Sequence, residues 1–152
     1  MITSDFFGDI VNAGLRQLGV SSIESIRNGI LYIAKFELND GIKLAYVFNI
    51  TKKQRYFLQR VLPYPLSYGY FKSPEDIVRF IQKDLDKFKN AQNSHNFKQF
   101  LDISETFHEA SLDWEKLFLE RNVSKEAMDE LERSAAALLD AIHAAYENCS
   151  EI

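Results

Sequence analysis

The chain has 152 residues, enough to bury a core of its own, and its 46% hydrophobic and 13% aromatic residues exclude a wholly disordered protein. The net charge of −4 is unevenly spread, because residues 1–96 carry 13 Lys and Arg against 9 Asp and Glu (net +4), whereas residues 97–152 carry 5 against 13 (net −8). The single cysteine, Cys149, excludes an internal disulfide, and we find no secretory signal and no apolar run of the roughly 20 residues that span a membrane. We therefore expect a cytoplasmic protein that does not bind membranes.

The first segments predict a helix followed by a strand. Ser4 or Thr3 can cap a helix that runs to about Leu18, and Gly19 can end it. Gly14 lowers helix propensity, and we interpret it as a mark of close packing against a neighbouring element. A short strand over residues 22–27 then leads into a hairpin.

Residues 30–38 and 42–50 predict a β-hairpin with a defined register. Even-numbered positions are apolar on both sides of Asn39-Asp40-Gly41. A three-residue loop with Gly41 in the left-handed conformation keeps these positions on one face, whereas a two-residue loop would divide them between both faces. The expected pairs are Leu38 with Ile42, Phe36 with Leu44, Ala34 with Tyr46, Tyr32 with Phe48 and Ile30 with Ile50, and on the other face Glu37 with Lys43 and Ile33 with Val47.

Residues 52–62 fit either a strand or a helix. We favour a strand from Tyr56 to Val61, because Pro63 and Pro65 follow directly. Residues 62–66 then predict an extended crossover, and residues 67–71 a short return segment. Six of the seven tyrosines lie between positions 32 and 70. Because their hydroxyl groups need hydrogen-bond partners, we expect them along the edge of the sheet.

A second helix begins at Ser73-Pro74, with serine as the cap, proline in the first turn and two acidic residues after it. It extends to about Lys89, and the polar residues 90–96 predict a linker. The helix carries an apolar stripe that can cover one face of the sheet. This stripe comprises Ile77, Ile81, Leu85 and Phe88.

Beyond the linker, apolar residues recur at alternating spacings of three and four, which predicts two helices of coiled-coil character over residues 97–121 and 124–149. Their short connector predicts an antiparallel hairpin, and the alanine-rich second helix should approach the first closely around Phe107 and Trp114. The acidic excess either solvates the outer helix faces, or helps the oppositely charged halves of neighbouring chains associate, or attracts a basic partner. The first seam comprises Phe100, Ile103, Phe107, Ala110, Trp114 and Leu117, and the second Met128, Leu131, Ala135, Leu138, Ile142, Ala145 and Cys149.

These elements define an α+β fold. We expect an antiparallel β-meander of three to five strands with an N-terminal helix and a covering helix, followed by a C-terminal antiparallel helical hairpin. The α+β domain should comprise residues 1–90. The hairpin, over residues 97–150, is either an appendage or part of the same core.

The sequence contains no motif for catalysis or for a cofactor. Glu105 and His108 share a three-residue spacing with Asp140 and His143, as in carboxylate-bridged metal bundles, but the heptad pattern points both pairs away from the seam. The glycines are too scattered for a phosphate-binding loop, and Cys149 falls at a seam position. We therefore predict no catalytic residue, no metal site and no cofactor.

Two stretches remain as candidate binding sites. One is a tyrosine-rich cleft for a small molecule or substrate, formed by Tyr64, Tyr68 and Tyr70. The other is a basic turn next to aromatic residues, a pattern found in nucleic-acid-binding proteins, although the net negative charge argues against this function. The basic residues of this turn are Lys52, Lys53, Arg55 and Arg60.

Our leading interpretation is a non-catalytic protein-interaction or regulatory module. Two helices alone leave much apolar surface outside a single seam, so we expect the hairpin to pair with a protein partner, and specifically with its own copy in a homodimer. The alternatives are a small-molecule-binding protein or enzyme that uses the tyrosine-rich cleft, and a nucleic-acid-binding protein that uses the basic turn.

Overall fold

The structure is a computed structural model that describes residues 3–26, 31–50 and 55–150. The chain forms two compact units, Met1–Glu105 and Thr106–Ile152. The division falls within the third helix and not in the polar segment 90–96, because Phe97 is buried against Phe88 in the first unit.

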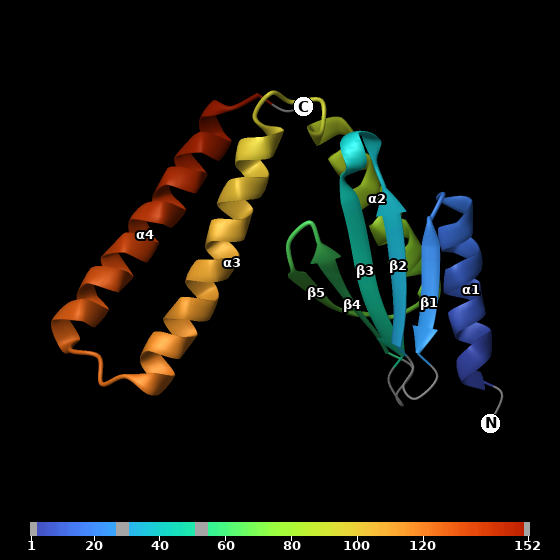
Figure 1. Cartoon of the computed structure of the whole chain (residues 1–152), viewed down its shortest axis with the longest axis horizontal. Helices are drawn as coiled ribbons and strands as arrows, with labels where there is room; N and C mark the ends of the chain where they lie inside the picture. The colour runs from blue at the N-terminus through green and yellow to red at the C-terminus, as the bar shows by residue number, and fades with distance from the viewer. Residues whose placement is uncertain (1–2, 27–30, 51–54, 151–152) are drawn as a thin grey trace. The chain divides into compact units, whose positions relative to one another are not determined.

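The first unit contains a five-stranded antiparallel sheet whose strands lie in chain order (Figure 1). The strand prediction for the ambiguous stretch after residue 55 is confirmed. Residues 63–65 join the last two strands as a hairpin, so the expected crossover is wrong. The strands are β1 (Ser22–Ile26), β2 (Leu31–Glu37), β3 (Lys43–Ile50), β4 (Tyr56–Leu62) and β5 (Leu66–Phe71).

The predicted register of the β2–β3 hairpin is confirmed. Tyr32 pairs with Phe48, and Glu37 pairs with Lys43 on the opposite face. The three-residue loop Asn39–Gly41 is a short 3₁₀ turn in which Gly41 adopts a φ of 74°. The alternation of apolar residues therefore determined the register, because a shift by one residue would turn the whole apolar face outward. Ile30 lies outside the described residues.

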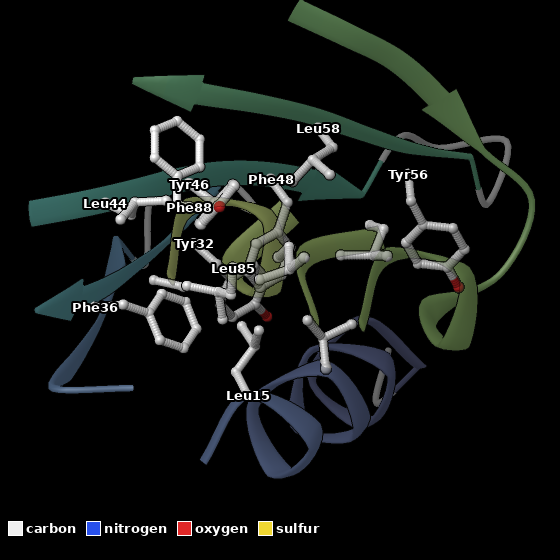
Figure 2. Close-up of a cluster of buried hydrophobic side chains, with 14 of the residues drawn as sticks. Leu15, Tyr32, Phe36, Leu44, Tyr46, Phe48, Tyr56, Leu58, Leu85 and Phe88 are labelled. Atoms are coloured by element: carbon white, nitrogen blue, oxygen red, sulfur yellow. The ribbon is translucent and has the colours of Figure 1, made fainter. Parts of the chain in front are cut away.

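Two helices, α1 (Thr3–Gln17) and α2 (Pro74–Ala91), cover the same face of the sheet (Figures 1 and 2). They pack closely at Gly14, where a β-carbon would lie 2.8 Å from Val78 Cγ2, which confirms the role predicted for this glycine. The Ser73 hydroxyl accepts a hydrogen bond from the Asp76 N–H, as the cap prediction requires. The core contains Val11 and Leu15 from α1, Tyr32, Ala34, Phe36, Leu44, Tyr46, Phe48, Ile50, Tyr56 and Leu58 from the sheet, and Ile77, Ile81, Leu85 and Phe88 from α2.

The other face of the sheet carries Ile33, Val47 and Phe57, which are half-buried. Since α1 and α2 both pack on the even-numbered face, α1 does not cover this second face.

Three tyrosines correct the expectation that these residues line the sheet edge. Tyr32, Tyr46 and Tyr56 are buried, and they lie on the inner strands β2, β3 and β4. The ring of Tyr32 stacks on Phe48 with centroids 4.9 Å apart. A tyrosine can occupy the centre of a core where its hydroxyl group meets a polar partner, which for Tyr46 is Asp84 on α2.

The helices α3 (Phe97–Glu120) and α4 (Lys125–Asn148) run antiparallel (Figure 1). The Ser124 hydroxyl caps α4 by accepting a hydrogen bond from the Ala127 N–H. The expected close approach of the two helices is wrong. Phe107 and Trp114 remain 43% and 42% exposed, and a cavity of about 710 Å³ lies between the helices. Trp114 on α3 and Leu131 and Leu138 on α4 line this space without filling it.

Candidate functional site

A buried charge pair joins the sheet to α2. Tyr46 and Arg60 are cross-strand neighbours on β3 and β4, and both side chains face the helix layer. Arg60 donates from Nη1 to Asp84 Oδ2 over 2.8 Å, and the Tyr46 hydroxyl donates to the same oxygen over 2.7 Å. Arg60 is only 2% exposed, so its charge is compensated by Asp84 within the protein.

Aromatic rings surround the Arg60 guanidinium. Its Cζ lies 4.5 Å from the ring centroid of Tyr64, 4.7 Å from that of Phe88 and 5.6 Å from that of Tyr68. These distances lie within the range of cation–π attraction, which is strongest where water is excluded. The rings thus help to stabilise a cation that the core would otherwise reject.

A β-bulge directs Tyr68 toward Arg60. Leu58 pairs with Gly69 and Gln59 pairs with Ser67, so Tyr68 is an extra residue in β5. Gly69 has a φ of 81°, a conformation that favours glycine. The extra residue brings Tyr68 to the helix-covered face, where its ring lies 4.3 Å from that of Phe80 on α2.

A small cavity of about 290 Å³ opens beside this cluster, and we call it the Arg60 cavity. Its polar groups come from Arg60, Asp84 and Lys87. The Nε–H of Arg60 is fully buried and has no hydrogen-bond acceptor among the residues that the structure describes. The aromatic residues that line the cavity are Tyr64, Tyr68, Phe88 and Phe100.

Tyr46 and Tyr68 stay protonated at neutral pH. Burial raises the pKa of Tyr46 far above its usual value, and the neighbouring Asp84 carboxylate raises it further. Burial also raises the pKa of Tyr68 to about 12, with Arg60 opposing the shift and Asp84 adding to it. Both hydroxyl groups are therefore available as donors.

The structure brings together two of the three tyrosines of the predicted cleft. Tyr64 and Tyr68 both contact Arg60, whereas Tyr70 pairs with Phe57 on the opposite face, with ring centroids 5.3 Å apart. The bulge explains this separation, because it places Tyr68 and Tyr70 on different faces although they are two residues apart.

The basic residues of the predicted nucleic-acid turn lie in different surroundings. Arg55 is exposed, and its guanidinium lies 4.7 Å from the ring centroid of Tyr70. Arg60 instead belongs to the buried cluster. Lys52 and Lys53 lie outside the described residues.

Sequence reasoning missed Tyr46, Asp84 and Phe88 as members of a site. A signal for Asp84 was available, because residues 77, 81, 84 and 88 form a stripe of inward positions on α2, and Asp84 is its only charge. Arg60 likewise shares the inward alternation of Tyr56 and Leu58 on β4. Opposite charges at two inward positions predict a buried ion pair.

A second candidate surface lies on the helical hairpin of the unit Thr106–Ile152. Its large apolar seam residues are each 37% to 45% exposed, and we call them the hairpin seam. This pattern differs from a folded core, in which such residues are almost fully covered. The hairpin seam comprises Phe107, Trp114, Leu117, Leu131, Leu138 and Ile142.

Over the ranges that the structure describes, no three His, Cys, Asp or Glu side chains gather closely enough to hold a metal ion. None of the helices in these ranges combines the length and the apolar character of a membrane span. The chain gives no significant match to protein families, to curated proteins or to solved structures.

Proposed function

We propose that this chain is a non-catalytic interaction module that self-associates through its helical hairpin. The observation that carries the proposal is the exposed hairpin seam. Six large apolar side chains at heptad spacing remain uncovered when the two helices of one chain are the only partners available.

The area of this surface suits a specific dimer. Each seam side chain exposes about 40% of an area on the order of 200 Å², which sums to roughly 500 Å² per chain. Two facing hairpins would therefore bury about 1,000 Å², near the lower limit of specific interfaces. Flanking apolar residues with still greater exposure would extend it, namely Leu112, Phe118, Leu119, Leu139 and Tyr146.

Symmetry and the cavity between the helices also support a second copy of the hairpin as the partner. In a two-fold symmetric pair, the same seam meets itself, and four antiparallel helices form a bundle around one apolar core. The cavity of about 710 Å³ between α3 and α4 is lined by Trp114, Leu131 and Leu138, so side chains from a second hairpin can fill it. Acidic residues then remain on the outer faces, where water solvates them.

Sedimentation equilibrium of the full chain at micromolar concentration tests this proposal. We expect a dimer for the natural sequence and a monomer for Leu138→Glu, because a carboxylate in the bundle core would be desolvated. Ala137→Glu is the matched control, since it adds the same charge one residue away, outside the hairpin seam, and should leave the dimer intact. A monomeric natural chain, or a dimer that Leu138→Glu does not weaken, would contradict the proposal.

A further inference from the structure

Arg60 presents an unsatisfied donor edge in the first unit. Asp84 accepts from Nη1, while Nε is buried without an acceptor among the described residues. Buried donors in folded proteins almost always have a partner, so an unpartnered one requires an explanation such as a water, an ion or a ligand that binds there. In a guanidinium group, Nε and Nη2 point in the same direction, and their spacing matches the two oxygens of a carboxylate.

The walls of the Arg60 cavity are suited to a flat apolar group. Tyr64 and Phe88 both lie against the guanidinium, with their ring centroids 6.4 Å apart, and Tyr68 and Phe100 extend the aromatic surface. The volume of about 290 Å³ lies at the small end of ligand-binding cavities, so it accepts a single ring and excludes larger bodies.

The charges around the cavity select an anion. Asp84 compensates Arg60, and Lys87 on the next turn of α2 adds a further positive charge to the lining. The Tyr68 hydroxyl remains protonated and can donate to the same ligand. A monoanion would therefore leave the cavity neutral, whereas a cationic ligand would meet Lys87 and Arg60.

We propose that the Arg60 cavity binds a small carboxylate that carries an aromatic ring. The carboxylate accepts from the free edge of Arg60, and the ring packs against Tyr64, Tyr68 and Phe100. This inference does not depend on self-association of the hairpin, because every residue that carries it belongs to the unit Met1–Glu105.

Titration of the ¹⁵N-labelled full chain with phenylacetate tests the proposal, and the Arg60 Nε–H resonance is the direct reporter. We expect this resonance to shift with saturation, together with the ring protons of Tyr64 and Tyr68. Phenylacetamide has the same ring without the charge and should bind at least tenfold more weakly, because charged hydrogen bonds are about twice as strong as neutral ones.

A pair of lysine variants separates the site from general charge effects. Lys87→Gln should weaken phenylacetate binding several-fold, because it removes the second positive charge from the cavity. Lys83→Gln lies one turn away on α2 outside the cavity lining, so it should bind as the natural chain does. The proposal would be overturned if the acid and the amide bound with equal affinity, or if the two lysine variants had equal effects. It would also be overturned if the Arg60 Nε–H resonance did not shift on addition of phenylacetate.

Discussion

Replacement of Asp84 by leucine should test whether the buried charge pair stabilises the first unit. The change leaves the Arg60 guanidinium, 2% exposed, without its carboxylate, and it removes the acceptor of the Tyr46 hydroxyl. Breaking a buried ion pair costs about 3–5 kcal/mol, and an unsatisfied buried hydroxyl adds about 1–3 kcal/mol. Cation–π attraction from the rings around Arg60 offsets up to about 2 kcal/mol of this cost, so we expect the free energy of unfolding to fall by about 4 kcal/mol.

The triple variant Tyr46→Phe/Arg60→Met/Asp84→Leu should restore stability to within about 1 kcal/mol of the natural chain, because apolar residues of similar volume replace a buried pair without desolvated charge. Urea unfolding followed by the amide resonances of β3 and β4 reports this unit separately from the hairpin. Arg79→Met is the control, since it removes an exposed pair with Asp76 from the same helix and should cost less than about 1 kcal/mol. A loss below about 1 kcal/mol for Asp84→Leu, or a triple variant no more stable than the single one, would refute this reasoning.

Three further predictions concern the same unit. Gly14→Ala should destabilise this unit by about 1–3 kcal/mol in urea unfolding, because the new β-carbon would lie 2.8 Å from Val78 Cγ2. The loss is expected although alanine has the better helix propensity. The double variant Gly14→Ala/Val78→Ala should recover most of it. Because burial raises the pKa of Tyr46 above its unfolded value of about 10, the unfolded state loses this proton first as pH rises. Above about pH 10 the free energy of unfolding of the natural chain should therefore fall by up to about 1.4 kcal/mol per pH unit more than that of Tyr46→Phe. Urea unfolding at several pH values tests this, and the same pH dependence for both chains would contradict it. Ser73→Ala should cost about 1 kcal/mol by thermal unfolding, since it removes the acceptor of the Asp76 N–H, whereas Ser73→Asp should retain stability.

The tyrosine-rich cleft shows which members of a site a sequence pattern can predict. The sequence indicated Tyr64 and Tyr68, because aromatic residues with polar groups cluster there. It grouped Tyr70 with them, because simple alternation places residues 68 and 70 on one face. The bulge at Gly69 breaks that alternation, and nothing in the local sequence distinguishes a bulge from a regular strand containing glycine.

The charged members of the cluster could in principle have been predicted from the sequence. Arg60 appeared as part of a basic turn, although its position in the β4 alternation places it inward. A charge at an inward position is interpretable only together with its partner, and Asp84 is 24 residues away on another element. Pairing the two requires the packing of α2 on the sheet, which the linear sequence does not specify.

By itself, the sequence determined the approximate extents of most helices and strands, the register of the β2–β3 hairpin and the serine caps of α2 and α4. These features depend on interactions between residues close in the chain or on an alternation of period two, which one segment can express alone. The tertiary structure decided which face of the sheet α1 covers, how the bulge turns Tyr68, and how Arg60, Asp84 and Tyr46 meet. Each of these results depends on residues from separate elements that compete for the same buried space, and the outcome follows from how their volumes and charges fit together.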